Sequence, residues 1–458
     1  MGDGWDATLF VWGIWTDTVV VTLLLAYRSR KFPYTDDWVL LPVLTGEEPV
    51  TLGWLWAPHV GHRIFLPKLI FLALYNSLVG YDFRAGVLVN ISLLSACAFV
   101  LMLAARRVRG WTSYSDAFFP LALVNSGGGL LSNFNLQFVG ATVIASMILW
   151  VIVRHGSWMT PLSSLGVGFC LVLLPLCGLN GLVLVPALLS WFGYSAIRQG
   201  PFCSHTLIAL TLAVASLFLC LLYLVGYENP APDLASPGLN ATLTTAAGFL
   251  SASFGTPFSS YLDRWPYWRL MVPAVLMISG MVLGANVLKN QEGRPRAVGL
   301  FMFIVAFVSL ALAVGIGRGG RPSWEGLDRH YGTAALPVLC SVYFILDIHV
   351  SRTASRLVQM SLFALMCGVF ALNTSDAIAW SGSIRQGEAA TEQDILARVQ
   401  PCELAKRHMR QFFSGDTAWR RNVVVAGLRS LHRVNAGPFR LLRDDQPGAE
   451  CKWNLGPN

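Results

Sequence analysis

The sequence has little charge for its length. Only 13% of its 458 residues are Asp, Glu, Lys or Arg, whereas 54% are hydrophobic and the mean hydropathy is +0.55. Soluble globular domains carry about 25% charged residues, so this composition excludes an ordinary water-soluble fold. The chain must instead be interpreted with lipid as its principal solvent.

Two further absences narrow the classes of function. The cysteines show no metal-ligand spacing, and most lie in or beside apolar runs, where they are expected to be small buried side chains. The net charge of +8 is spread over loops and tail, without a basic stripe interleaved with aromatic residues, so no nucleic-acid partner is expected. Cys402 and Cys451 fall in the polar C-terminal stretch, where an oxidising compartment would permit a disulfide.

Long apolar runs dominate what is present. A helix that crosses the ~30 Å hydrocarbon layer needs roughly 20 apolar residues. We therefore expect an all-α polytopic membrane protein with about 11 transmembrane helices. The expected spans are 8–27, 83–105, 115–130, 137–153, 163–178, 181–197, 205–226, 268–288, 298–317, 333–349 and 357–373. The third and fifth are short and contain Gly or Pro.

Lys and Arg in the short loops indicate the orientation, because cytoplasmic loops are enriched in both. With the N-terminus in the cytoplasm, every later inner loop is basic. These loops carry Arg106, Arg107, Arg109, Arg154, Arg198, Lys289, Arg294, Arg296, Arg352 and Arg356. Arg28, Arg30 and Lys31 disagree, because they directly follow the first span on the opposite side. We predict a cytoplasmic N-terminus and an extracytoplasmic C-terminus.

Three outer loops are too long or too polar to be simple turns, namely 28–82, 227–267 and 318–332. Connecting segments longer than about 12–15 residues are usually functional or disordered, so function is expected on the outer face. Apolar stretches at Ile64–Leu78 and Ala241–Phe254 predict interfacial helices within the first two loops.

The charge density divides the chain into two parts. Residues 1–373 form the expected transmembrane domain. Residues 374–458 are richer in charge and are expected to form a small soluble extracytoplasmic tail, with a helix from Thr391 to Phe413.

The first candidate site is the acidic pair in Tyr34-Thr35-Asp36-Asp37-Trp38. Carboxylates beside apolar residues at a membrane edge are partly desolvated, which raises their pKa and suits a general base. A turn or helix cap is the structural alternative, because Asp often has that role.

A second cluster follows in Pro58-His59-Val60-Gly61-His62-Arg63 and Pro67-Lys68. His59, His62, Arg63 and Lys68 are candidates to bind a phosphate or diphosphate, since Arg gives bidentate bonds and Lys a point charge. The histidines could instead bind a metal together with an Asp, or the cations could simply reach toward the interface.

A third cluster combines glycine with arginine in Gly317-Arg318-Gly319-Gly320-Arg321 and extends to Arg329 and Tyr331. Glycines allow backbone N–H groups to approach a ligand, and clustered arginines favour a polyanion. Arginines at the edge of a span can also serve only as membrane anchors.

Amides provide smaller signals. Asn133, Asn135 and Gln137 lie close together in the sequence, and Asn180 follows an apolar run. They are predicted to line an outward-facing polar cavity, although each could equally cap a broken helix.

In this order the segments resemble those of the polytopic GT-C glycosyltransferases, and more particularly a bacterial-type group among them. The likeness covers about residues 8–350. It lies in the first span, the Tyr34–Trp38 segment, the Pro58–Lys68 segment, Asn133–Phe138, Asn180-Gly181 and the stretch from Gly317-Arg318 to Arg329-His330-Tyr331.

The resemblance implies a GT-C-like bundle in the bacterial inner (plasma) membrane. It implies transfer of a sugar from a polyprenyl-phosphate-linked donor to a hydroxyl of a glycan, lipid or protein acceptor on the extracytoplasmic face. Asp37 or Asp36 would act as base or metal-associated carboxylate in an inverting displacement. Arg63, His62, Arg318 and Arg329 would stabilise the departing lipid phosphate.

The chain departs from the family at Val60-Gly61, where an Asn-Glu pair is usual. The missing carboxylate weakens a metal-dependent interpretation, although a divalent cation, Mg²⁺ or Mn²⁺, remains the candidate cofactor. Two other interpretations stay open: a transporter or flippase of lipid-linked saccharides, and a catalytically silent membrane scaffold.

Overall fold

The computed structural model of the chain describes residues 3–59, 61–75, 81–125, 129–155, 159–198, 204–227, 237–262, 267–319, 327–444, 451 and 453. Within these ranges the regular structure is helical, apart from one isolated backbone bridge between His59 and His62. The α-helices are α1 Asp3–Tyr27, α2 Asp37–Leu44, α3 Leu52–Trp56, α4 Phe65–Ala73, α5 Arg84–Arg109, α6 Phe118–Leu123, α7 Leu136–His155, α8 Pro161–Leu173, α9 Leu179–Arg198, α10 Ser204–Leu224, α11 Leu239–Ser251, α12 Thr256–Leu262, α13 Met271–Lys289, α14 Arg294–Arg318, α15 Arg329–His349, α16 Arg352–Leu396, α17 Pro401–Phe412 and α18 Ala418–Arg433. The 3-10 helices are η2 Tyr114–Ala117, η3 Asn133–Asn135, η4 Leu174–Cys177, η5 Ala252–Phe254, η6 Trp268–Leu270 and η7 Gly437–Leu441.

Nine helices of the described chain are long and apolar enough to cross a membrane: α1, α5, α7, α9, α10, α13, α14, α15 and α16, with η3 and η6 extending α7 and α13. Two of the eleven expected spans are shorter than this. The 115–130 run contains only η2 and α6, which ends at Leu123 before a glycine-rich stretch. The 163–178 run lies within Pro161–Cys177, where Pro175 turns the last residues into η4. The chain is thus an all-α protein with the helices of a multi-pass membrane protein.

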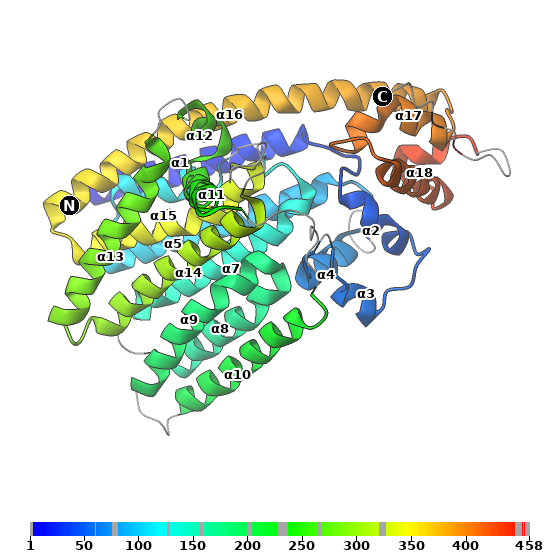
Figure 1. Cartoon of the computed structure of the whole chain (residues 1–458). Helices are drawn as coiled ribbons and strands as arrows, with labels where there is room; N and C mark the ends of the chain where they lie inside the picture. The colour runs from blue at the N-terminus through cyan, green and yellow to red at the C-terminus, as the bar shows by residue number, and fades with distance from the viewer. Residues whose placement is uncertain are drawn as a thin grey trace.

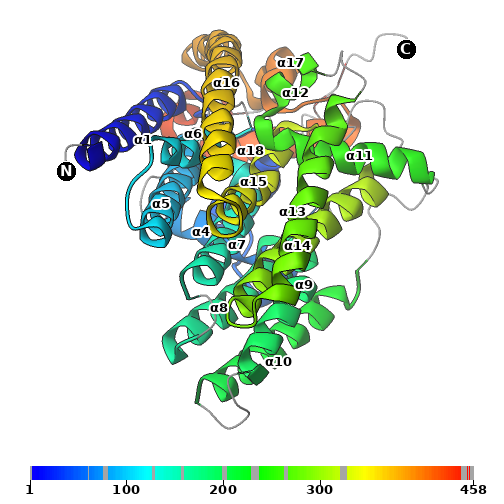
Figure 2. The ribbon, with the colours of Figure 1, turned by 90° about the vertical axis from the view of Figure 1, so that its left-hand side faces the viewer.

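Most elements outside the apolar bundle gather at one of its ends. Figures 1 and 2 show α16 along one side of the bundle and α10 along the opposite side. In Figure 1, α2, α3 and α4 of the first outer loop lie at the same end as α17 and α18 from the C-terminus. We refer to these five helices as the cap. The helices predicted within the first two outer loops are present as α4 and α11.

The C-terminal residues are part of this cap and not a separate appendage. α16 continues through residue 374 to Leu396 without a break, so the expected domain boundary falls inside a helix. The helix expected over Thr391–Phe413 is interrupted, because Arg398 adopts a left-handed φ of 58° and Pro401 starts α17. Cys402 and Cys451, for which the sequence left a disulfide open, are joined by one.

One hydrophobic core joins the first outer loop to α17 and α18. Trp38 is fully buried, and its ring meets that of Phe412 edge-on at a centroid distance of 5.1 Å. Gly427 of α18 lies against the same indole, so that a Cβ at this position would come within 2.6 Å of the Trp38 ring. The end of the chain therefore determines where the segment with Asp36 and Asp37 lies.

This packing predicts opposite effects of one substitution at two helical glycines. Ala replacing Gly in a helix gains about 1 kcal/mol from propensity. Gly382→Ala in α16, with open space around it, should therefore raise the thermal unfolding midpoint in detergent. Gly427→Ala should lower it, because forced overpacking costs about 1–3 kcal/mol. Equal stabilisation by both substitutions would contradict the close contact between α18 and Trp38.

Candidate functional site

A cavity of about 710 Å³ lies where the cap meets the bundle. Its volume falls within the range of about 300–1,000 Å³ typical of small-molecule sites. Nine residues predicted from the sequence line it: Asp36, Asp37, His59, His62, Asn133, Asn135, Gln137, Arg318 and Arg329. The three charged outer segments, which lie far apart in the chain, therefore converge on one cavity.

Asp37 is the most deeply buried acid of the cavity, with 3% of its surface exposed. Its carboxylate accepts hydrogen bonds from Asn133 Nδ2 at 2.6 Å and from the Tyr34 backbone N–H at 3.0 Å. Burial raises the pKa of Asp37 to about 7, while these two hydrogen bonds oppose the rise. The negative charge of Asp36 raises this pKa further and Arg30 lowers it. Near neutral pH, Asp37 can therefore exchange a proton.

Asn133 is held in the orientation that Asp37 requires. Its Oδ1 accepts a hydrogen bond from the Tyr75 hydroxyl at 2.8 Å, which leaves Nδ2 to donate to Asp37. Gly86 makes room for this amide, because a Cβ there would overlap Asn133 Oδ1 at 1.6 Å. The chain of hydroxyl, amide and carboxylate thus holds Oδ1 of Asp37, while the Tyr34 backbone N–H holds Oδ2.

The C-terminal part of the chain shapes the loop that contains both acids. Thr35 adopts a left-handed φ of 53°, and its N–H donates to the Phe412 carbonyl at 2.8 Å. The same carbonyl accepts from Trp38 Nε1 at 3.1 Å. Residues on both sides of Asp36 and Asp37 are thus anchored to one oxygen at the end of α17.

The two histidines face each other across a tight turn. Their backbones exchange hydrogen bonds of 2.6 and 2.9 Å, and Gly61 between them has a φ of 79°, which favours glycine. His59 Nε2 lies 3.8 Å from Asp36 Oδ2, and its ring packs on Phe134. Burial, assisted by the charge of Arg318, lowers the pKa of His62 to about 4. At neutral pH, His62 is thus an uncharged polar group.

Cations reach the cavity from two facing helix ends. Arg318 is the last residue of α14 and Arg329 the first of α15. Arg329 pairs with Asp376 of α16 at 3.0 Å and lies over the ring of Trp380. Asp328, also in the wall, has its pKa raised to about 6 by burial, although Arg318 opposes this rise. The wall beside α14, α15 and α16 therefore combines positive charge with an aromatic face.

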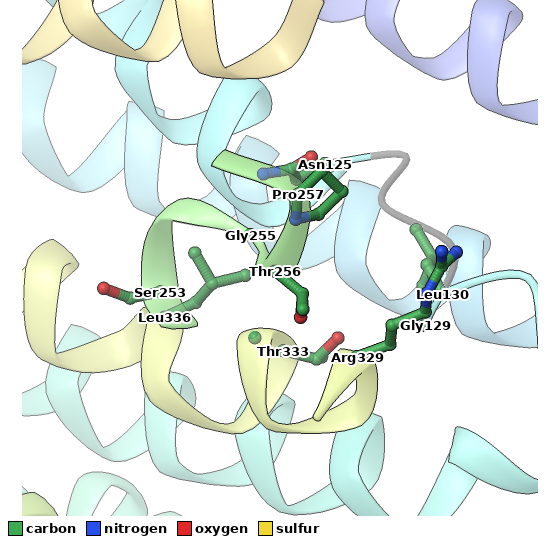
Figure 3. Close-up of a pocket in the computed structure, with 11 residues that line it drawn as sticks. Asn125, Gly129, Leu130, Ser253, Gly255, Thr256, Pro257, Arg329, Thr333 and Leu336 are labelled. Carbon is green, nitrogen blue, oxygen red and sulfur yellow. The ribbon is translucent and has the colours of Figure 1, made fainter. Parts of the chain in front are cut away.

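A small polar recess adjoins the cavity at Gly129 and Arg329, which line both spaces. Figure 3 shows Asn125 and Pro257 facing Thr333 and Arg329 across it. Its volume of about 20 Å³ has room for one water molecule. The recess widens the polar surroundings of Arg329 without adding a second binding chamber.

The donor set does not fit a metal held by protein ligands. No group of three or more His, Cys, Asp or Glu side chains suited to a metal ion occurs in the described part of the chain. Both oxygens of Asp37 already accept hydrogen bonds, and Asp36 has one histidine beside it. We therefore derive no step through a divalent cation.

Two predicted phosphate-binding residues lie outside the cavity wall. Arg63 donates to the carbonyls of Trp56, Tyr223 and Val225 at 2.7–3.1 Å. The bonds to Tyr223 and Val225 satisfy carbonyls at the end of α10, where backbone carbonyls lack partners within the helix. Lys68 Nζ donates to backbone carbonyls of the α3 region at 2.7 and 2.9 Å. Both cations hold the first outer loop together.

Two other predicted residues, Tyr331 and Asn180, are also not found in the wall. Tyr331 is buried, and its ring meets Phe249 edge-on at 5.5 Å within the core. Asn180 starts α9 and donates to the Gln137 carbonyl at 3.3 Å. Arg321 lies outside the described residues.

Arg30 and Trp380 are wall residues that escaped prediction. Arg30 had a visible signal, because it broke the charge pattern of the inner loops. Its guanidinium lies 3.8 Å from the Tyr34 ring centroid and donates to the Gln411 carbonyl. The adjacent Lys31 pairs with Glu392 of α16. Cations bound to the protein in this way report poorly on membrane orientation.

Comparisons with family models, curated proteins and solved structures find no match to this chain. The function must therefore be argued from the cavity itself.

The hydrogen bonds of Asp37 predict opposite pKa shifts in two variants. Asn133→Ala removes a donor to the carboxylate and should raise the pKa of Asp37 above about 7. Asp36→Asn removes a nearby negative charge and should lower it. Infrared difference titration against Asp37→Asn measures this carboxyl directly. Asp82→Asn is the control, since Asp82 pairs with Arg84 outside the cavity. A titration unchanged by both Asn133→Ala and Asp36→Asn would contradict the assigned contacts, and Asp82→Asn should leave it unchanged.

Proposed function

We propose that this protein is a GT-C-type glycosyltransferase. It moves a sugar from a polyprenyl-phosphate-linked donor to an acceptor hydroxyl on the extracytoplasmic face of a bacterial inner membrane. One observation carries the proposal: Asp37, with a pKa of about 7, shares a single cavity with Arg318 and Arg329. A base and cations are the two elements that displacement of a phosphate leaving group needs.

Asp37 acts as the general base. The acceptor oxygen attacks the anomeric carbon, and its proton passes to the Asp37 carboxylate. A base is most effective when its pKa lies near the working pH, because it is then both deprotonated and able to take a proton. Asp36 is half-buried and tunes the pKa of Asp37 from beside it.

Arg318 and Arg329 stabilise the leaving group. The bond between the anomeric carbon and the phosphate oxygen breaks, and its electron pair stays on the lipid phosphate. Guanidinium groups fit phosphate oxygens with two parallel hydrogen bonds, and their charge counts for more where water is excluded. Asp376 holds Arg329 at the edge of the cavity, which limits the reorganisation required during the reaction.

Neutral polar groups are suited to the sugar. His62 is uncharged at neutral pH, and Asn135 and Gln137 present amides in the same wall. Such groups donate to and accept from sugar hydroxyls without competing for the phosphate. The aromatic face of Trp380 suits the apolar face of a sugar ring.

The position of the cavity favours transfer over transport. Its wall residues come from helix ends and loops at the cap end of the bundle, such as the end of α14 and the start of α15. A flippase would need polar groups through the whole membrane depth. The disulfide of the cap supports an extracytoplasmic location, because disulfides persist in oxidising compartments.

Substitution of the two acids tests the base. With a panel of polyprenyl-phosphate sugars and purified protein, Asp37→Asn should lower turnover by about 10²–10⁴-fold, the usual contribution of a general base. Asp36→Asn should retain most turnover and shift the rising limb of the pH–rate profile to lower pH, as it lowers the pKa of Asp37. Full activity in both single variants and in the double variant would remove the base from the mechanism.

A series of variants that remove single charges tests the leaving-group site. Arg329→Gln should lower turnover by about 10–10³-fold, because a preorganised donor to developing negative charge is lost. It also leaves Asp376 unpaired, so Arg329→Gln/Asp376→Asn is the essential companion. If the cation acts on the leaving group, the double variant stays slow, whereas recovery would assign Arg329 a purely structural role. Arg385→Gln, an exposed residue of α16, is the matched control for loss of charge.

A further inference from the structure

A second large cavity lies away from the cap. Its volume is about 880 Å³, and its walls come from α5, α7 and the start of α14. Four arginines border it: Arg106, Arg107, Arg154 and Arg296. They stand at the C-terminal ends of α5 and α7 and the N-terminal end of α14, the ends remote from Arg318 and from the Asn135 end of α7.

In the part of the chain that the structure describes, no carboxylate neutralises the charge of these arginines. None of the four forms an ion pair with an acidic side chain in the described ranges of the chain. Arg296 Nε is buried without a hydrogen-bond partner. The nearby Arg109 behaves differently, because it pairs with both Asp116 and Asp347. Among the described residues at this end of the bundle, Arg109 thus has carboxylate partners, whereas the four arginines around the cavity have none.

The deeper part of the same cavity is apolar. Val100, Leu103 and Ala104 of α5 and Val153 of α7 line it. Val100 lies seven residues before Arg107, which corresponds to about 10 Å along a helix axis. Leu103 is 42% exposed, so this wall opens sideways toward the lipid. Trp150 also lines the cavity, and the guanidinium of Arg154 lies 4.9 Å from the centre of its ring.

We propose that this cavity binds an anionic phospholipid, with the phosphate among the arginines and an acyl chain along the apolar wall. Arginine forks match phosphate oxygens, and clusters of cations between membrane helices favour acidic headgroups. The cavity opens at membrane depth, which a soluble anion would not require. The inference depends on the membrane-spanning character of the chain and not on the proposed transferase activity.

Native mass spectrometry of the purified full chain tests the proposal. Phosphatidylglycerol and phosphatidylcholine with identical acyl chains are titrated separately. The wild type should bind phosphatidylglycerol about tenfold more tightly, because both lipids carry a phosphate but the choline cation of phosphatidylcholine is repelled by the arginines and cancels the negative charge. A factor of ten corresponds to about 1.4 kcal/mol. Arg106→Gln/Arg107→Gln/Arg154→Gln/Arg296→Gln should abolish this preference. If this quadruple variant does not fold, the exposed pair Arg106→Gln/Arg107→Gln alone should reduce it several-fold.

Arg352→Gln/Arg356→Gln is the matched control, because both arginines are exposed at the start of α16 and lie outside the cavity. This variant should keep the full preference. Equal binding of the two lipids by the wild type, or equal loss in the control, would overturn the proposal. Binding of soluble glycerol phosphate as tightly as phosphatidylglycerol would assign the cavity to a soluble anion and overturn the lipid assignment.

Discussion

A carboxylate can be buried only where its oxygens find hydrogen-bond donors, and the site around Asp37 is organised by this constraint. Asn133 and the Tyr34 backbone supply the two donors, while burial still raises the pKa of Asp37 to about 7. The donors do not cancel the cost of burial. The result is a group that gives and takes a proton near neutral pH, which an exposed aspartate would not do.

Keeping these donors in place involves residues from the whole length of the chain. Gly86 at the start of α5 makes room for Asn133, and Tyr75 orients its amide. From the other end of the chain, the Phe412 carbonyl anchors Thr35 and Trp38 on either side of the acids. Removal of the C-terminal residues would thus disturb the acidic loop directly. If a truncated chain lost activity, the loss would follow from the disturbed acidic loop, and it would not distinguish an enzyme from a scaffold.

Positive charge is used differently in different parts of this bundle. Arg63 and Lys68 donate their hydrogen bonds to backbone carbonyls, and Arg109 forms ion pairs with two carboxylates. Arg318 and Arg329 instead border a cavity at helix ends, and so do the four arginines of the second cavity. A cluster of cations in the sequence does not distinguish these roles, because the same residue, arginine, can bind a ligand or cap a helix. Only the surrounding acceptors decide between them.

The apolar runs of the sequence are enough to indicate a membrane protein and to predict most of its long helices. A helix that crosses the lipid needs a long apolar run, and such a run is visible in the sequence. The sequence also indicated which segments hold the acids, the histidines and the arginines, since polar residues beside apolar runs are conspicuous. Two of the eleven predicted spans, 115–130 and 163–178, correspond to shorter helices, because local breaks interrupt them.

Which of those side chains lie together in one cavity is seen only in the folded chain. Asp37 and Arg329 line the same cavity, whereas Arg63 donates to backbone carbonyls outside it. The C-terminal residues share a hydrophobic core with the segment 28–82. The tertiary structure also revealed Arg30 in the cavity wall, although in the sequence this residue stood out only as an exception to the charge pattern of the loops. These outcomes depend on contacts between residues up to several hundred positions apart, and the periodicity of apolar residues along one chain does not encode such pairings.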